Sequence, residues 1–74
     1  MRRAPALLRA WRAARGVSQS EAGHLIGLRQ YEWSRLETGE RMPAADEASR
    51  IARITGGAVP VGAWEDIPRR RVAV

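Results

Sequence analysis

Small and apolar positions recur with helical spacing most clearly over residues 17–39, in two short segments that flank Gly27. Within each segment they lie three or four residues apart, which places them on one face of a helix. These positions are Ala22, Gly23, Ile26, Leu28, Trp33 and Leu36. Ser18 followed by Glu21 is the pattern of a capping box at a helix start, and Gly27 tolerates the positive φ of a tight turn. The pattern therefore predicts two helices joined by a short turn.

Another amphipathic segment precedes this pair. Its apolar stripe consists of Leu7, Leu8, Trp11 and Ala14. Pro5 stands where a helix can begin and Gly16 where one can end, so we expect a helix over 6–15 after a loose basic arm over 1–5. This arginine-rich segment also has the composition of a transit peptide or a membrane-surface helix, but it continues without a linker into the next helix.

Two more elements follow the pair. The stretch 44–54 has one apolar side and carries acidic residues early, where the helix dipole favours anions. That side consists of Ala48, Ile51, Ala52 and Thr55. The glycines at 56–57 end the segment, and a short last helix is expected near Pro60. Its apolar side chains are expected to cover the open end of the core or a partner subunit; they are Val59, Val61 and Trp64. The pattern as a whole predicts an all-α fold.

The composition indicates which class of partner the chain can bind. The chain has 74 residues, enough for one small domain, and it has no cysteine, so neither a disulfide nor a thiolate metal site holds it together. The net charge is +5, and all 13 basic residues are arginines. This charge indicates an anionic partner, and the planar guanidinium suits phosphates and guanine edges. A GC-rich genome produces the same arginine bias, and the sequence leaves both explanations open.

The sequence gives little support for a catalytic site or a metal site. His24 is the only histidine, so neither a metal triad nor a histidine-based catalytic set can form within one chain. The acidic pairs at 46–47 and 65–66 are sequence neighbours, which do not face each other across a substrate. The sequence has no phosphate-binding glycine motif and no run of 18 apolar residues. We therefore expect no enzymatic activity, no cofactor, no metal and no membrane partner.

The stretch VSQSEAGHLIGLRQYEWSRLETGER resembles the core motif of the Cro/C1-type helix-turn-helix domains of lambdoid phage repressors and many bacterial regulators. The likeness extends from about Leu7 to Trp64. The matching elements are the Ser18-Gln19 start, Gly27, the Ser34-Arg35-Leu36-Glu37 run, Gly39 and the Arg41-x-Pro43 exit. Together these elements are far more specific than a helix-turn-helix pattern alone.

The resemblance implies a compact five-helix, lambda-repressor-like DNA-binding domain with the helix-turn-helix over 18–37. We expect a single domain over 1–74, with a five-helix core over 6–65. The remaining stretch, 66–74, contains three consecutive arginines and is expected to be a basic, partly disordered tail.

The resemblance also implies roles for individual side chains. The second helix of the motif lies in the major groove of DNA in this family, and the positions facing the bases are Gln30, Tyr31, Ser34 and Arg35. The positions expected at phosphates are Gln19, Arg29 and Arg41. Gln19 is also expected to support Gln30. Arg12 and Glu37 match a largely buried structural salt bridge of the family.

These residue types suit their roles on physical grounds. The glutamine amide presents a donor and an acceptor together, which fits the edge of adenine. Tyr31 can contact a thymine methyl with its ring or donate its hydroxyl to a phosphate. Arg29 stands next to the positive end of its helix and fits a phosphate better than a base. The alternative for Gln30, Tyr31 and Arg35 is a solvated helix face without a ligand.

The chain departs from the family at several positions. The family usually has leucine where this chain has Ala22, alanine where it has Gly23 and an aliphatic β-branched residue where it has Trp33. We hypothesise that the indole fills the space left by the two small residues, which requires Trp33 to be buried. Arg29 replaces a serine or threonine cap, which leaves the start of the helix over 29–37 without a capping side chain.

The favoured function is therefore a sequence-specific, repressor-like transcriptional regulator that binds double-stranded DNA. One such module makes a small interface, so we expect a homodimer on a two-fold operator, formed through the segment around Trp64 and the tail. The alternative is a protein-interaction module of the antitoxin or anti-repressor type. We expect a cytoplasmic protein of bacterial or phage origin, without a small-molecule ligand.

Overall fold

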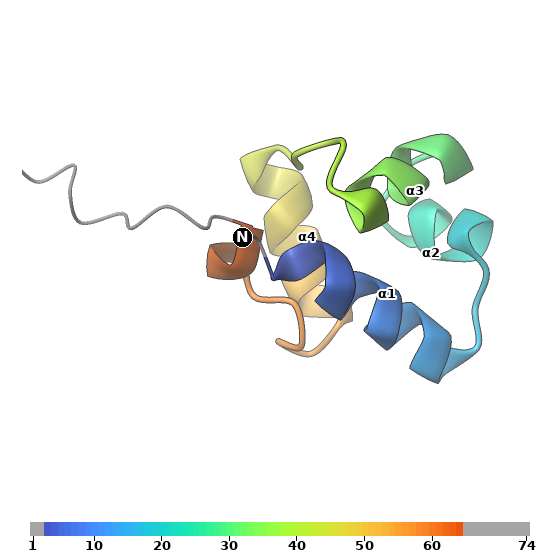
Figure 1. Cartoon of the computed structure of the whole chain (residues 1–74), viewed down its shortest axis with the longest axis horizontal. Coiled ribbons are helices and arrows are strands. Elements are labelled where there is room, and N and C mark those ends of the chain that lie inside the picture. The colour runs from blue at the N-terminus through green and yellow to red at the C-terminus, as the bar shows by residue number, and fades with distance from the viewer. Residues whose placement is uncertain (1–2, 65–74) are drawn as a thin grey trace, which may run out of the picture.

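Four α-helices and one short 3-10 helix, η1, make up the computed structural model, which describes residues 3–64 (Figure 1). The elements are α1 (Ala4–Arg15), α2 (Gln19–Leu25), α3 (Gln30–Thr38), α4 (Ala45–Ile54) and η1 (Val61–Trp64). The described part contains no strand, which confirms the all-α class. The predicted tail over 66–74 and the first two residues of the predicted arm lie outside the described residues. Within 3–64, no helix combines the length and the apolar character needed to cross a membrane.

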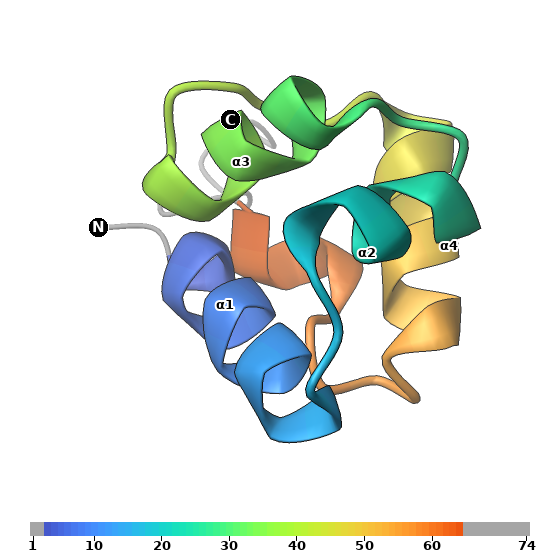
Figure 2. The same ribbon diagram turned by 90° about the vertical axis from the view of Figure 1, so that its right-hand side faces the viewer.

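The helices enclose a single apolar core. Helix α3 packs against both α2 and α1 (Figure 2), while η1 contacts α4 and α1 and lies at the end of the domain opposite α2 (Figure 1). The core consists of Ala4, Leu8, Ala22, Ile26, Leu28, Trp33, Leu36, Ala48, Ile51, Val59, Ala63 and Trp64. All the small or apolar positions predicted for the α2–α3 pair are therefore in the interior, together with Gly23.

Helix α1 begins earlier than predicted. Ala4 and Pro5 belong to the helix rather than to a loose arm, and Ala4 is fully buried. Proline fits the first helical turn because the backbone N–H groups there have no intrahelical partner, so Pro5 does not prevent the helix from starting before it. At the other end Gly16 adopts a left-handed conformation with φ 69°, as predicted. Ala14, which the apolar stripe included, is exposed.

The predicted fifth helix is a single 3-10 turn and not an α-helix. It has four residues, and its first bond runs from Ala63 N to Pro60 O at 2.9 Å. A segment this short closes one tight turn and stops. Ala63 and Trp64 are buried, but Val61, predicted as an apolar contact, is 43% exposed. Val61 therefore does not cover the core, and its contact with a partner subunit stays a prediction.

Thr55 connects α4 to the segment that leads into η1. Its hydroxyl donates to the carbonyl of Ile51 at 2.8 Å and accepts the N–H of Val59 at 3.2 Å. Thr55 and Val59 are both buried, so the hydroxyl satisfies backbone groups that water does not reach. The chain beyond α4 is thereby held against the core.

Candidate nucleic-acid interface

The α2–α3 pair is fixed by local contacts that the sequence pattern indicated. The Ser18 hydroxyl accepts the N–H of Glu21 at 3.0 Å, and the Glu21 carboxylate accepts the N–H of Ser18 at 2.8 Å. This is the predicted capping box. Gly27 occupies the turn with φ 77°, and Leu28 follows as its buried residue. The start of α2 and the turn are therefore both defined by short-range chemistry.

Gly23 lets the turn fold back closely onto α2. The N–H of Leu28 donates to the carbonyl of Gly23 at 2.8 Å. A Cβ on Gly23 would lie 2.9 Å from the carbonyl oxygen of Leu28 and 3.3 Å from that of Arg29. Trp33 is fully buried, as required by the hypothesis that its indole fills the space left by Ala22 and Gly23. The close backbone approach also explains the glycine at position 23 independently of Trp33, because a side chain there would push against the backbone that leads into α3.

The start of α3 is capped from within the helix. Arg29 is the N-cap residue and makes no capping hydrogen bond through its side chain, as predicted. Its backbone N–H instead donates to the carboxylate of Glu32 at 2.8 Å. Glutamate three residues after the cap is the second half of a capping box, and its negative charge also suits the first turn. Glu32 therefore stabilises the helix start that the sequence left without a cap.

The outer face of α3 carries the predicted base-facing residues. Gln30, Tyr31 and Arg35 are exposed, and Ser34 is half-buried. Trp33, Leu36 and Glu37 occupy the opposite face in the interior. Helix α3 is thus held from behind and presents hydrogen-bonding groups outward. That arrangement suits a helix that enters a groove of DNA.

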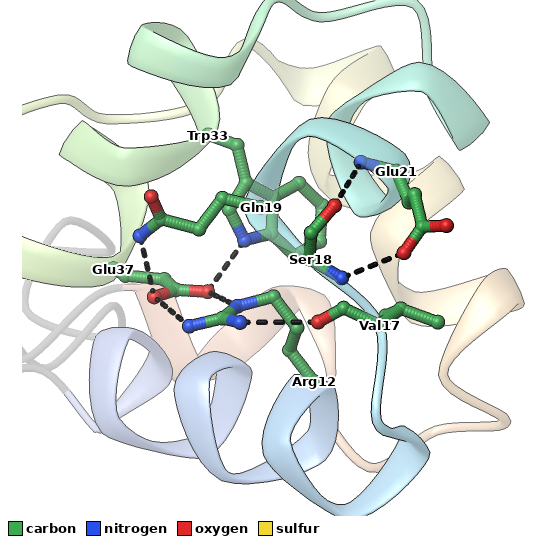
Figure 3. A network of polar contacts seen from close by, with 7 residues as sticks. All are labelled: Arg12, Val17, Ser18, Gln19, Glu21, Trp33 and Glu37. Atoms are coloured by element: carbon green, nitrogen blue, oxygen red, sulfur yellow. Dashed lines mark hydrogen bonds and ion pairs between the residues drawn. The ribbon is translucent and has the colours of Figure 1, made fainter.

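Behind α3, the carboxylate of Glu37 joins three helices (Figure 3). Arg12 of α1 donates from Nε to Oε2 at 2.5 Å and from Nη2 to Oε1 at 3.1 Å. Trp33 Nε1 donates to Oε2 at 2.5 Å, and Gln19 Nε2 of α2 donates to Oε1 at 3.2 Å. Arg12 also donates to the carbonyl of Val17 at 3.1 Å. We call these four side chains, Arg12, Gln19, Trp33 and Glu37, the Glu37 cluster.

The Glu37 cluster keeps its central carboxylate ionised. Burial by itself raises the pKa of Glu37, but hydrogen bonds from Arg12, Trp33 and Gln19, with the positive charge of Arg12, outweigh it, so the pKa lies below the usual value. The pKa of Arg12 is raised, chiefly by its hydrogen bond to Glu37. The Glu37 side chain is only 3% exposed, and its position is fixed by donors from α1, α2 and α3.

Gln19 has a hydrogen-bond partner inside the domain. It was expected to support Gln30, yet no hydrogen bond joins the two among the described residues, and the Gln19 amide donates to Glu37 instead. A buried carboxylate oxygen attracts a nearby amide donor more strongly than a neutral side chain does. Gln19 is half-buried, and its contact with phosphate stays a prediction.

Arg41 also has an internal partner. Its guanidinium lies on Glu47 at the start of α4, with Nη2 3.1 Å from Oε2 and Nη1 3.1 Å from Oε1. Glu47 accepts the N–H of Ala44 at 3.0 Å as well, so it both caps α4 and holds the loop after α3. The hydrogen bond to Glu47 raises the pKa of Arg41. The expected phosphate contact of Arg41 stays a prediction, but its charge is matched within the domain.

Some arginines pair with carboxylates inside the domain and others do not. Arg12, Arg41 and Arg50 pair with carboxylates, and Arg50 also donates to the carbonyl of Ile26 at 3.3 Å. Arg29 and Arg35 are exposed on and beside α3, and within 3–64 neither guanidinium pairs with a carboxylate. Arg9, Arg15 and Arg53 are likewise exposed without a carboxylate partner in that range, so α3 carries part of the unpaired positive charge and not all of it.

Three contributions were missed at the sequence level. The caps made by Glu32 and Glu47 had a signal, since each glutamate stands three residues after the N-cap position. No signal in the sequence indicated that the indole N–H of Trp33 donates to Glu37, because Glu37 was assigned to Arg12 alone. No group of three or more metal-ligating side chains occurs within the described range.

Comparison with known protein families identifies a helix-turn-helix domain. The model of a family described as a helix-turn-helix domain matches residues 6–64, most of the chain. No curated protein and no solved structure matches the chain. The matched range contains all of α2, the turn and α3, and extends from α1 through η1.

Proposed function

Because the chain belongs to the helix-turn-helix domain family, we propose that it is a sequence-specific regulator of transcription that places α3 in the major groove of double-stranded DNA. The observation that carries this proposal is the two-sidedness of α3. One face is fixed in the core by Trp33, Leu36 and Glu37, while the other exposes polar side chains and unmatched arginines. We further propose that the domain is of the Cro/C1 type and acts as a repressor.

Each exposed side chain of α3 has a chemically suitable partner in the groove. Gln30 offers a donor and an acceptor to adenine, and Ser34 is suited to either type of base-edge group. Arg29, directly before the helix N-terminus, suits a phosphate, because unpaired backbone N–H groups and the helix dipole favour an anion there. Base contacts supply specificity in this proposal, and phosphate contacts fix the register.

A dimer is part of the proposal. A single module of this kind buries roughly 600–1,000 Å² on DNA, which is little for tight binding. Two modules on half-sites about 34 Å apart would double that area and match a two-fold operator. The protein would then act in the cytoplasm, bound to the nucleoid, and the DNA would be its ligand without any small molecule or cofactor.

Selection of binding sites from random duplexes tests the proposal. The full chain is mixed with the duplex pool, bound duplexes are sequenced, and the affinity for the selected site is then measured at about 50 and about 200 mM salt. We expect a two-fold consensus and an affinity that falls steeply with salt, since released counterions drive phosphate binding. A pool without consensus and a flat salt response would exclude the proposal and favour a protein-interaction module of the antitoxin type.

A further inference from the structure

Two exposed side chains on the outer face of α3 stack on each other. The guanidinium carbon of Arg35 lies 5.2 Å from the ring centroid of Tyr31, one helical turn earlier. Tyr31 is 54% exposed, so its ring is largely uncovered by the rest of the domain. A guanidinium over an aromatic face is attracted by the ring quadrupole and is held in a limited range of orientations.

The surroundings of Arg35 leave its donors available. Glu32 lies three residues before it on α3, a spacing at which an ion pair commonly forms, but its carboxylate accepts the N–H of Arg29. Glu40 accepts the hydroxyl of Thr38 at 3.2 Å. Within 3–64 the Arg35 guanidinium therefore contacts an aromatic ring and no acid.

We infer that Tyr31 and Arg35 form a paired reader for a guanine in the operator, an inference that rests on the proposed DNA-binding function. Arginine presents two parallel N–H donors that match O6 and N7 of guanine in the major groove. Arg35 supplies these donors, and Tyr31 is the positioning residue that restrains the plane of the fork. Restraint before binding lowers the entropy lost when the contact forms.

A phosphate contact is the competing role for Arg35, and the two roles differ in what they recognise. A phosphate contact strengthens binding to every sequence, whereas a guanine contact discriminates at one position of each half-site. The chain also holds a matched pair, Arg15 stacked on Trp11 of α1 with the guanidinium 5.4 Å from the ring centroid. The C-terminal end of α1 lies away from α3 in Figure 2, so this pair shares the chemistry but not the position.

Base discrimination on the selected operator tests the inference. For each variant, affinity is measured for the operator and for operators with one base pair changed. We expect Arg35→Ala to reduce the preference for guanine at one position by about tenfold to a hundredfold, the range of one bidentate base contact. Tyr31→Ala should reduce the preference at the same position, and Tyr31→Phe, which keeps the ring face, should retain it. Arg15→Ala should leave base preference unchanged.

The opposite results separate the possible failures. If Arg35→Ala weakens binding to all sequences equally, Arg35 contacts a phosphate and the inference is overturned. If Tyr31→Ala leaves the guanine preference intact, the stack has no part in reading. A selection that yields no operator would overturn the proposed function and the paired reader with it, whereas an operator read without Arg35 would overturn the paired reader alone. Circular dichroism of each variant verifies that these surface changes leave the helices folded.

Discussion

At the scale of single residues, Trp33 combines two roles that are usually separate. Its ring fills the largest fully buried position of the core, and its N–H donates to the carboxylate of Glu37 at 2.5 Å. A hydrogen bond to a charged group contributes about 1.5–3 kcal/mol to stability, more than one between neutral groups. The indole therefore stabilises the Glu37 cluster as well as the packing between α2 and α3.

Phenylalanine at position 33 isolates the contribution of the indole N–H. Trp64 supplies a matched control, because it is also buried and its Nε1 has no hydrogen-bond partner within 3–64. Both Trp→Phe changes remove similar ring area, but only Trp33→Phe removes a hydrogen bond. We expect Trp33→Phe to lower the free energy of unfolding in urea by about 1.5–3 kcal/mol more than Trp64→Phe does. Equal losses would show that the bond to Glu37 contributes nothing measurable.

The ionisation of Glu37 predicts how stability depends on pH. Burial raises its pKa, but hydrogen bonds from Arg12, Trp33 and Gln19 outweigh burial, so the folded pKa lies below the ordinary 4.5. The unfolded chain therefore binds a proton at higher pH than the folded one. The stabilisation is fully present above about 4.5 and is lost as pH falls through the folded pKa. Glu47, whose pKa is also lowered despite burial, acts in the same direction.

The indole N–H resonance of Trp33 provides a specific probe of this titration. Protonation of Glu37 changes the acceptor of that N–H, so the resonance should shift with a midpoint below 4.5, in parallel with the fall in stability measured by urea unfolding. Trp33→Phe assigns the resonance. The Trp64 indole, which has no such acceptor among the described residues, should not follow the same titration. A midpoint above 4.5 would mean that burial dominates.

Sequence reasoning reached part of this residue-level arrangement. The pairing of Arg12 with Glu37 was available only through family resemblance, since the two residues are 25 positions apart in the chain. The donors Gln19 and Trp33 were placed at a phosphate and in the core, because a one-dimensional pattern does not show which polar atoms converge on a buried carboxylate. Their convergence depends on how three helices cross.

At the scale of elements, the angle between α2 and α3 depends on Gly23. Alanine has a higher helix propensity by about 1 kcal/mol, which alone would favour Gly23→Ala. A Cβ there would lie 2.9 Å from the carbonyl oxygen of Leu28, which belongs to the backbone and not to a flexible side chain. Overpacking of this kind typically costs about 1–3 kcal/mol. The turn would have to move, and α3 would move with it.

We therefore expect Gly23→Ala to destabilise the domain by about 1–2 kcal/mol despite the gain in propensity. Gly62→Ala is the control, because a Cβ at Gly62 meets nothing within 4 Å and the residue has no positive φ. That change should stay within about 0.5 kcal/mol of the wild type. Urea unfolding of both variants compares them directly. A stabilised Gly23→Ala variant would show that the turn adapts without strain.

The elements themselves were largely predictable, and the exceptions have local causes. The capping box of α2, the turn at Gly27 and the end of α1 at Gly16 follow from short-range chemistry that a sequence displays. Two boundaries did not follow. Helix α1 starts before Pro5, where Ala4 packs into the core, and η1 is a short 3-10 turn whose residues Ala63 and Trp64 are buried in that core. Tertiary packing decides both.

At the scale of the whole molecule, the arginines differ in whether their positive charge is balanced by a carboxylate within the domain. The net charge of +5 counts every arginine alike, yet the structure matches some of them with carboxylates inside the domain. Arg41 lies on Glu47 with both terminal nitrogens 3.1 Å from carboxylate oxygens, and its side chain is 28% exposed. Arg29 is exposed beside the N-terminus of α3 and pairs with no acid within 3–64. Composition alone does not distinguish the two.

The salt dependence of DNA binding separates these two arginines. Each phosphate neutralised contributes about 0.9 to the slope of log affinity against log salt. We expect Arg29→Ala to reduce the slope by about one for each domain bound, and to weaken binding to operator and unrelated duplex alike.

Arg41→Ala should reduce the slope less, because the charge of Arg41 is already balanced by Glu47. Its main effect should be a loss of stability, since Glu47 then keeps its charge without a partner. Titrations from about 50 to 200 mM salt, with urea unfolding of the same variants, measure both effects. If Arg41→Ala lowers the slope as much as Arg29→Ala, the Arg41–Glu47 pair opens on DNA and Arg41 contacts the backbone as the family resemblance implies.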